Sequence, residues 1–219
     1  MSASLSELKK LPFWEKLSTE GQHDMAVCAQ VRNYSKGELI YSHEHECLGL
    51  VAVLEGSVRI FMLSEEGREI LLYRLHVGDT DVLSASCVIN QITFETQMTA
   101  EDDCKLLIIP AVCLSRFKEN DLNVRCYIFE KLGERFSDVM QQMQRMLFTR
   151  VDKRVADSLL RRMEESGSTV FSVTHEEIAG EINSSREVVS RILKDMERRN
   201  ILKLGRGKIT VLEKSLLEL

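Results

Sequence analysis

Residues 185–198 carry a pattern that restricts this part of the chain to one kind of structure. Wound as an α-helix, at about 100° per residue, the segment separates its apolar and polar side chains onto two opposite faces. The apolar face consists of Val188, Val189, Ile192, Leu193 and Met196. The opposite face consists of Arg186, Glu187, Ser190, Arg191, Lys194 and Arg198. This face has a short side chain near the helix start and is otherwise mostly cationic, with Glu187 as its one acidic residue. Such a face suits a helix that lies in the major groove of DNA.

The flanking sequence predicts a winged helix-turn-helix domain over residues 150–219. Thr174 to Glu177 has the spacing of a capping box, so a helix is expected to begin there. Asn183 marks a break after this helix, because Asn tolerates the left-handed conformation that a tight turn needs. Ser184 to Glu187 repeats the capping-box spacing and is expected to start the two-faced helix. Two short apolar runs within residues 202–211 then predict a hairpin with a basic tip.

The N-terminal part of the chain predicts an antiparallel β-structure. After a helical opening over residues 4–29, Gly56, Gly67 and Gly78 recur every eleven residues and separate β-branched or alternating runs. The expected strands include residues 57–62, 69–75, 92–99 and 104–109. About eight short strands fit a Greek-key or jelly-roll topology. The expected fold class is therefore α+β, with a β-roll sensor domain over residues 1–120.

A long helix is expected over residues 121–149, between the β-roll and the C-terminal domain. Its apolar residues follow the 3-4-3-4-3 spacing of a coiled-coil seam. The seam consists of Phe129, Leu132, Phe136, Val139, Met143 and Met146. The pattern favours a parallel homodimer joined along this helix over a helix that packs only on its own domain.

The formal net charge of −5 hides a difference between the two parts of the chain. Residues 1–149 hold 15 lysines and arginines against 22 acidic residues, a net charge of −7. Residues 150–219 hold 14 against 12, a net charge of +2. Such an asymmetry is typical of a sensor joined to a DNA-binding domain.

Composition also narrows the compartment and the class of protein. No apolar run approaches the roughly 20 residues that span a bilayer, and no secretory signal is readable, so we expect a cytoplasmic protein without a membrane partner. The six cysteines form no CxxC pair and are expected to be reduced, mostly buried thiols. They are Cys28, Cys47, Cys87, Cys104, Cys113 and Cys126. The five histidines show no triad-like arrangement and no phosphate-binding glycine loop occurs, so we expect no catalytic residues and no enzyme.

Taken together, the chain resembles the catabolite-activator and anaerobic-regulator (CRP/FNR) superfamily of bacterial transcription factors. The resemblance covers nearly the whole chain and rests on the glycine-spaced roll from Glu55 to Asp79, the long helix, and Ser185-Arg186-Glu187 with Arg191. It implies that Arg186 and Arg191 each bind a guanine edge and that Glu187 accepts from a cytosine amine. A competing interpretation makes Glu187 a cap of its own helix.

The resemblance further implies a palindromic operator in double-stranded DNA with TGTGA-like half-sites, one for each subunit of a homodimer. RNA polymerase is a candidate partner. Phosphate contacts, which set register rather than sequence, are expected from the hydroxyls and cations around the recognition helix and the wing. These residues are Thr174, Ser184, Ser185, Ser190, Lys194, Arg206 and Lys208.

The sensor departs from the cyclic-nucleotide members of the family. Those members place a Gly-Glu after a Gly-Asp turn and an Arg-Ser some ten residues later, whereas this chain has Leu83 and Gln91 at the matching positions. No Lys or Arg occurs between Asp79 and Cys104, so a phosphate buried there would lack a cation. We therefore expect that cyclic AMP is not the effector.

Several effectors remain open. An iron–sulfur cluster is not expected, because the N-terminal cysteine cluster of the oxygen-sensing branch is missing before Cys28. A small-molecule effector or a haem edge is expected at small side chains in the roll, a pocket made of Leu83, Ser84, Ser86, Cys87 and Gln91. Cys87 is a redox candidate, although a buried, inert thiol is favoured.

His43, His45 and Cys47 could share one strand face and hold a metal, but a solvated loop is favoured, so no metal is expected. A regulatory module that uses its winged helix to contact a protein partner is the alternative to a DNA-binding regulator. That alternative predicts no steep salt dependence of duplex binding, whereas phosphate neutralisation requires one.

Overall fold

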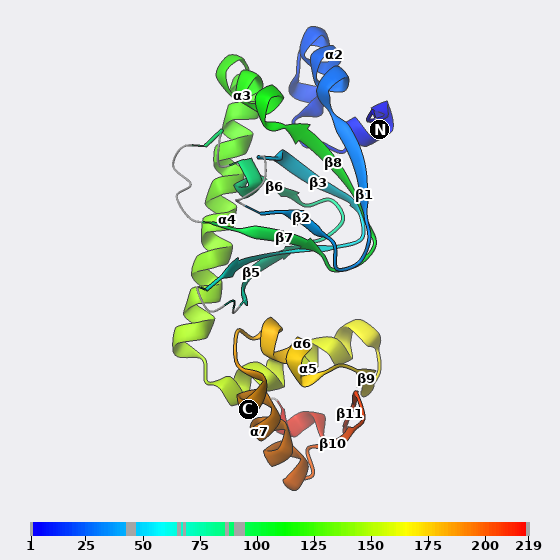
Figure 1. Cartoon of the computed structure of the whole chain (residues 1–219), viewed down its shortest axis with the longest axis vertical. Helices are drawn as coiled ribbons and strands as arrows, with labels where there is room; N and C mark the ends of the chain where they lie inside the picture. Colours follow the sequence, from blue (N-terminus) through cyan, green and yellow to red (C-terminus); the bar gives the residue numbers. More distant parts are fainter. Residues whose placement is uncertain are drawn as a thin grey trace. The chain divides into compact units, whose positions relative to one another are not determined.

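The computed structural model describes residues 2–42, 47–64, 67, 69–85, 88–89 and 95–217 (Figure 1). The chain divides into two compact units, and the boundary lies inside the long helix α4 (Leu122–Phe148), between Val139 and Met140. The second unit comprises Met140–Leu219 together with Glu69–Leu71. The sequence predicted three segments, with the helix as a separate linker, whereas here one continuous helix is shared by the two units.

Eight strands of the chain form two four-stranded antiparallel sheets, which face each other as a roll (Figure 1). The first sheet consists, in spatial order, of β1 (Gln30–Tyr34), β8 (Cys104–Pro110), β3 (Gly49–Glu55) and β6 (Thr80–Asp81). The second consists of β2 (Leu39–Tyr41), β7 (Gln97–Ala100), β4 (Val58–Leu63) and β5 (Glu69–Leu75). Most spatial neighbours are distant in sequence, which confirms the predicted jelly-roll class.

Successive side chains of the strands in the first sheet point alternately to its two faces, and each face belongs to a separate hydrophobic core. In β3, Leu50 and Ala52 pack on the face covered by helices, whereas Val51 and Val53 pack on the face toward the second sheet. Successive side chains of a strand point to opposite faces, so a continuous apolar run serves both. We call the cluster under the helices the outer core and the cluster between the sheets the inner core.

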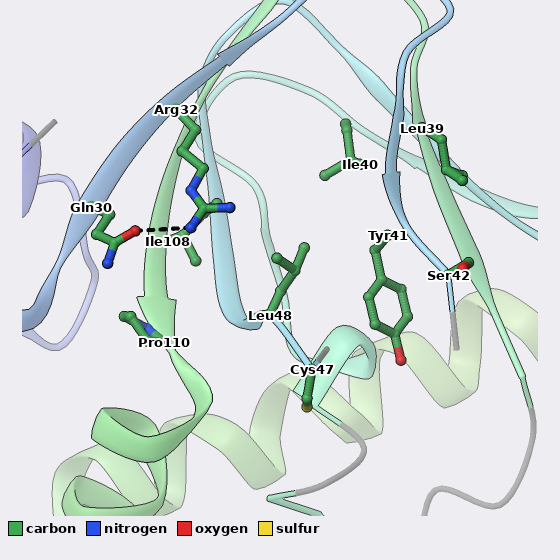
Figure 2. Close-up of a pocket in the computed structure, with 10 residues that line it drawn as sticks. All are labelled: Gln30, Arg32, Leu39, Ile40, Tyr41, Ser42, Cys47, Leu48, Ile108 and Pro110. Atoms are coloured by element: carbon green, nitrogen blue, oxygen red, sulfur yellow. Dashed lines mark hydrogen bonds between the residues drawn. The ribbon is translucent and has the colours of Figure 1, made fainter. Parts of the chain in front are cut away.

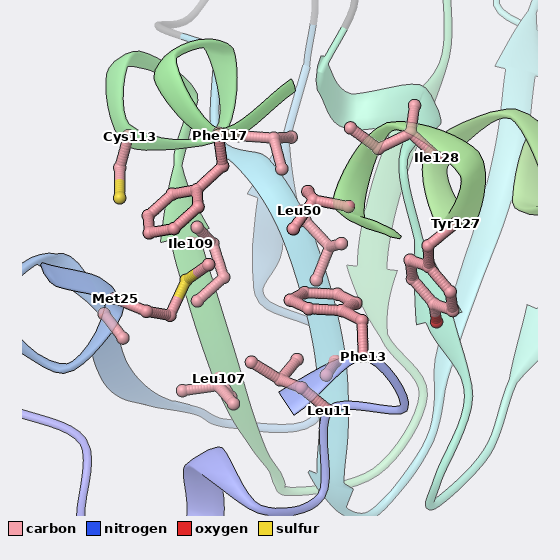
Figure 3. Close-up of a cluster of buried hydrophobic side chains, with 14 of the residues drawn as sticks. Leu11, Phe13, Met25, Leu50, Leu107, Ile109, Cys113, Phe117, Tyr127 and Ile128 are labelled. Atoms are coloured by element: carbon pink, nitrogen blue, oxygen red, sulfur yellow. The ribbon is translucent and has the colours of Figure 1, made fainter. Parts of the chain in front are cut away.

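Short helices cover the outer core (Figure 3). They are α1 (Leu5–Leu8), a 3₁₀ turn (Trp14–Lys16), α2 (Thr19–Cys28), α3 (Ala111–Asn120) and the first turns of α4. The helical opening predicted over residues 4–29 is therefore interrupted. Phe13 and Trp14, in the interruption, are almost fully buried, and Phe13 packs 4.9 Å from the ring of Tyr127 on α4.

The turn glycines behave as predicted. Gly56, Gly67 and Gly78 all have positive φ values, of 75°, 76° and 95°. At Gly56 a side chain would also clash, because a Cβ there would lie 2.4 Å from the carbonyl oxygen of Asp103. Of the predicted strand over residues 92–99, only the last part is observed as β7, and residues 92–94 lie outside the described range.

The prediction of reduced cysteines is wrong for Cys28 and Cys113, which form a disulfide with their Cα atoms 6.5 Å apart. Cys47 is likewise disulfide-bonded. Cys28 ends α2 and Cys113 lies in the first turn of α3, and both helices pack on the outer core. The fold thus brings together two residues that are 85 positions apart, and their spacing alone could not show it. Cys104 and Cys126 are free.

After the end of α4, the described part of the second unit contains three α-helices, a three-stranded sheet and a 3₁₀ turn (Lys214–Leu216). The helices are α5 (Val151–Ser166), α6 (His175–Glu181) and α7 (Arg186–Arg198). The strands are β9 (Val170–Ser172), β10 (Leu202–Gly205) and β11 (Lys208–Val211), in the order β10-β11-β9. Val155, Leu159, Ile178, Val189 and Leu193 join the helices in one buried core. This order of elements confirms the predicted winged helix-turn-helix.

Candidate nucleic-acid interface

Helix α6 begins and ends as the sequence predicts. The backbone N–H of Glu177 donates to the Thr174 hydroxyl at 3.1 Å, and the backbone N–H of Thr174 donates to the Glu177 carboxylate at 2.6 Å. This reciprocal pair is a capping box. Asn183, after the helix, has a φ of 52° and so takes the left-handed conformation that redirects the chain toward α7.

Helix α7 begins one residue later than the predicted capping box. Ser185 is the N-cap and accepts from the backbone N–H of Val188 at 3.4 Å. The predicted box from Ser184 to Glu187 is therefore wrong, because the capping residue is Ser185 and its third helical residue is Val188. Glu187 makes no hydrogen bond or ion pair to any described residue, so its carboxylate is not used as a cap.

The two faces of α7 are those that the sequence predicts. Val189, Leu193 and Met196 are 0%, 0% and 5% exposed and anchor the helix in the domain core. Arg186, Glu187, Arg191 and Lys194 are exposed. None of these four forms a hydrogen bond or an ion pair with the residues that the structure describes. An unneutralised set of side chains on a helix is available to a partner outside the chain.

The exposed face of α7 is hollowed. A cavity of about 710 Å³ is lined by Glu187, Ser190, Arg191, Lys194, Glu197 and Arg198. Ser190 is half-buried there, as are Ser184 and Ser185 at the helix start. The predicted base-reading residues Glu187 and Arg191 thus lie beside the predicted phosphate contacts Ser190 and Lys194.

The hairpin of β10 and β11, which we call the wing, presents the other two predicted phosphate contacts. Arg206 and Lys208 are exposed at its tip, where Gly207 has a φ of 65°. The backbone N–H of Leu204 donates to the Glu197 carboxylate at 2.8 Å, which holds the wing against α7. The wing and α7 therefore present their cations from the same packed domain.

His175, at the start of α6, belongs to this surface and was not predicted from the sequence. Its pKa is lowered from its usual value by burial first and then by the positive charges of Arg186 and Lys194. The histidine is therefore neutral at pH 7 in the free protein. Its position directly after the capping Thr174 was a usable signal, because helix N-termini commonly meet phosphates.

Part of the predicted seam of α4 faces outward and part faces the chain itself. Phe129, Phe136 and Met143 are 56%, 68% and 50% exposed. Leu132 and Val139 are instead partly buried against the inner core, and Met146 is half-buried. The exposed row is completed by the neighbouring positions. It consists of Leu122, Cys126, Phe129, Gly133, Phe136, Met140, Met143 and Leu147, and we call it the α4 seam.

The described part of the predicted effector pocket is filled. Leu83 and Ser84 are 4% and 1% exposed, and the Ser84 hydroxyl donates to the carbonyl of Gly49 at 2.9 Å. Leu83 packs in the inner core. Ser86, Cys87 and Gln91 lie outside the described residues, as do His43 and His45 of the candidate metal site. Among the described residues no group of three His, Cys, Asp or Glu could hold a metal.

Comparison with known proteins matches both units to families. Residues 31–121 match the model of the cyclic nucleotide-binding domain, and residues 153–219 match the Crp-like helix-turn-helix domain. A crystal structure of a putative transcriptional regulator of the crp/fnr family from Eubacterium rectale is 38% identical and superposes with a TM-score of 0.91. The match covers 96% of this chain and 97% of that one.

The chain belongs to the CRP/FNR family of transcriptional regulators. Among curated CRP/FNR proteins, the Cyclic AMP receptor protein of Thermus thermophilus is 26% identical over 96% of this chain and 97% of its own. The c-di-GMP responsive global regulator CLP of Xanthomonas campestris shares the fold, with a TM-score of 0.71 at 20% identity over 89% of this chain and 99% of that one.

Membership of the CRP/FNR family makes this protein a DNA-binding transcription regulator with a helix-turn-helix domain and a cyclic nucleotide-binding-like domain. Its relatives are transcription regulators and not enzymes. None of the helices that the structure describes is both long and apolar enough to cross a membrane.

Proposed function

We propose that this CRP/FNR protein is a homodimer that reads a palindromic operator with TGTGA-like half-sites through α7. The exposed, unneutralised face of Arg186, Glu187 and Arg191 carries this proposal. A guanidinium matches the O6 and N7 acceptors of guanine in a bidentate pair, and a carboxylate accepts from the cytosine amine. Thr174, Ser190, Arg206 and Lys208 would hold phosphates and fix the register.

The α4 seam supports the dimeric part of the proposal. Its members follow a regular 4-3-4-3 spacing along the helix, which is the pattern of two parallel helices in contact. Large apolar side chains such as Phe136 and Leu147 would be buried by a second copy of the same helix. Two recognition helices related by twofold symmetry then meet half-sites about 34 Å apart, one turn of DNA.

An effector acting on the β-roll would shift the equilibrium between two arrangements of the dimer, one of which spaces the recognition helices for DNA. We propose that this effector is not cyclic AMP. Leu83, at the position of the family's ribose-binding Glu, is a core residue, and residues 79–104 supply no cation for a phosphate. Millimolar cyclic AMP is expected to leave the melting temperature unchanged, and a Soret band in the purified protein would identify haem as the cofactor.

Selection of bound duplexes from a random pool, with purified protein at fixed salt, tests the operator. The expected result is a palindrome whose half-sites contain the guanines and the cytosine assigned above. An enriched motif without twofold symmetry would contradict the dimeric reader. Enrichment of no sequence, together with binding that does not weaken as salt rises, would support the protein-partner alternative instead.

A further inference from the structure

A cavity opens between the two sheets at the side where β1 and β2 are the edge strands (Figure 2). Its volume is about 520 Å³, within the range of small-molecule sites in proteins. Its walls come from β1, β2 and β8, with Ser42 directly after β2 and Cys47 and Leu48 directly before β3. They consist of Gln30, Arg32, Leu39, Ile40, Tyr41, Ser42, Cys47, Leu48, Ile108 and Pro110.

The alternation of β1 explains why the inner core is open here. Val31 points to the outer core, so Gln30 and Arg32 point to the other face. In the register with β8, Gln30 is opposite Ile108 and Arg32 is opposite Leu106, both of which belong to the inner core. An amide and a guanidinium therefore stand on β1 where the neighbouring strands β8 and β3 place apolar side chains.

Two polar side chains of this cavity, Arg32 and Tyr41, have no charged partner among the described residues. The Arg32 guanidinium donates to the neutral Gln30 Oε1 at 3.0 Å and forms no ion pair with any described residue. Tyr41 is only 5% exposed, yet its hydroxyl has no hydrogen-bond partner in the part of the chain that the structure describes. The Tyr41 oxygen is not among the fully buried polar atoms without a partner, so it keeps some contact with solvent, and a ligand atom in the cavity could exchange a hydrogen bond with it.

The arrangement also defines what could fit. Arg32 is the one charged residue among the described residues that line the cavity. Figure 2 shows Arg32 and Gln30 on one side and Tyr41 on the other, with Leu48 between them. A ligand in this cavity would meet the Arg32 guanidinium at one end, apolar side chains along its length, and the Tyr41 hydroxyl at the other end.

We infer that this cavity binds a small organic anion with an apolar body, whose carboxylate or sulfonate pairs with Arg32 while its body contacts Ile40, Leu48 and Ile108. Such a ligand would belong to the class of effectors that the proposed function requires. Only its regulatory role, and not its binding to the cavity, rests on that proposed function. A charge-assisted hydrogen bond to a guanidinium supplies the selectivity, because a cationic ligand of the same shape would be repelled.

Fluorescence titration with 8-anilinonaphthalene-1-sulfonate, an apolar anion, tests the site on the intact chain. We expect saturable enhancement at one site per chain, displaced by octanoate and not by octylamine or cyclic AMP. Arg32→Gln is expected to weaken the affinity about tenfold or more, and Tyr41→Phe to weaken the octanoate displacement by a smaller factor. Lys36→Gln removes the same charge from the hairpin between β1 and β2 without touching the cavity, and should leave the affinity within about twofold.

Equal binding by wild type and Arg32→Gln, or no saturable binding by wild type, would overturn the inference. A far-ultraviolet circular dichroism spectrum and a melting temperature for each variant separate lost binding from lost folding. Binding of Arg32→Gln to a duplex at low salt is measured in parallel. If Arg32→Gln still binds the duplex but no longer binds the anion, the result supports the cavity as the anion site. If wild type binds the anion but no duplex, only the proposed function is contradicted.

Discussion

At the level of single residues, the proposed function gives different tasks to two exposed arginines. Arg186 on α7 would pair with a guanine edge, and Arg206 on the wing would contact a phosphate. Arg186→Ala is expected to cost about 1–3 kcal/mol at the cognate operator and to relax discrimination at that one base pair. Arg206→Ala is expected to weaken binding to all duplexes alike and to reduce the magnitude of the slope of log K against log salt by about one.

Both variants are measured by fluorescence anisotropy on the selected operator and on single-base variants of it, at several salt concentrations. A uniform loss of affinity by Arg186→Ala over all sequences would show that this side chain contacts the backbone of DNA and not a base. Each variant is the matched control of the other, since both remove one exposed guanidinium from the same domain.

A second residue-scale prediction concerns Glu7 at the N-terminus. Its carboxylate lies 2.7 Å from the Lys105 ammonium on β8 and also accepts from the Ser4 backbone N–H at 2.8 Å. The hydrogen bond from Lys105, and then those from Ser4, lower the pKa of Glu7 from 4.5 to about 2. A carboxyl with a lowered pKa stabilises the folded chain above pH 4.5, and this contribution is lost as pH falls from 4.5 toward 2.

Glu7→Gln is therefore expected to have a lower urea midpoint than wild type at pH 7. The difference between the two midpoints should become smaller as pH falls below 4.5. Glu15→Gln serves as control, because Glu15 is exposed and forms no ion pair with the residues that the structure describes, and its difference from wild type should not change in this way. A constant difference between Glu7→Gln and wild type from pH 7 to pH 3 would mean that the loss has a cause other than the charge.

The sequence predicted single residues well where the signal is local. Thr174 and Glu177 are three positions apart, and their capping box depends on little beyond the helix itself. Ser184 and Ser185 offered two possible caps for α7, and the choice between them depends on where Asn183 turns the chain. His175 was missed because its environment depends on burial in the folded domain and then on two charges of another helix.

At the level of elements, a buried arginine of α4 adds polar contacts to the apolar packing that holds this helix on the β-roll. Arg135 is 7% exposed and donates to the Thr80 carbonyl at 2.8 Å and to the Asp138 carboxylate at 2.6 Å. Its guanidinium lies 4.8 Å from the ring centre of Tyr73, and its Nε lies 4.0 Å from the carboxylate of Asp81. The Tyr73 hydroxyl donates to Asp81 at 2.8 Å, and burial, with the charge of Asp81, raises the pKa of Tyr73 so that it stays a neutral donor.

Arg135→Met keeps the length and apolar stem of the side chain but leaves Asp81, which is 1% exposed, without its cation. Removing one partner of a buried ion pair typically costs about 3–5 kcal/mol, so we expect a large loss of stability in urea unfolding. Arg145→Met, at an exposed position of the same helix, is the control and should change stability by about 0.5 kcal/mol or less. The double variant Arg135→Met with Asp81→Asn should regain part of the loss, and an additive double variant would mean that the two charges do not interact.

The sequence predicted the helices and strands more reliably than it predicted what each of them packs against. Strand alternation and glycine turns are visible in the sequence, and β4, β5 and β8 lie within one residue of their predicted bounds. Whether a side chain of α4 meets its own sheet or a second molecule depends on how the helix packs, so Leu132 and Val139 were grouped with Phe129 and Phe136. The Cys28–Cys113 disulfide and the cavity at β1 and β2 depend on long-range strand order, which no local pattern records.

At the level of the whole molecule, the proposed dimer would link the sensor to the spacing of the two half-sites on DNA. Cys126 offers a direct probe of this dimer. This cysteine is exposed and lies in the α4 seam, three residues before Phe129. In a parallel, in-register pair of helices each seam residue meets its own counterpart, so two copies of Cys126 would face each other. Mild oxidation is expected to give a covalent dimer on a non-reducing gel in wild type and none in Cys126→Ser.

Phe136→Glu places a charge in the same seam and is expected to shift the protein to a monomer in sedimentation velocity and to prevent the cross-link. Val77→Glu alters an equally exposed apolar residue in the loop between β5 and β6 and should leave the dimer intact. In the proposed dimer two copies of α7 contribute to one operator, so the monomeric variant should bind an isolated half-site as well as wild-type subunits do but lose the gain from the second half-site. A Phe136→Glu protein that stays dimeric and cross-links through Cys126 would place the subunit interface on another surface and would uncouple α4 from operator spacing.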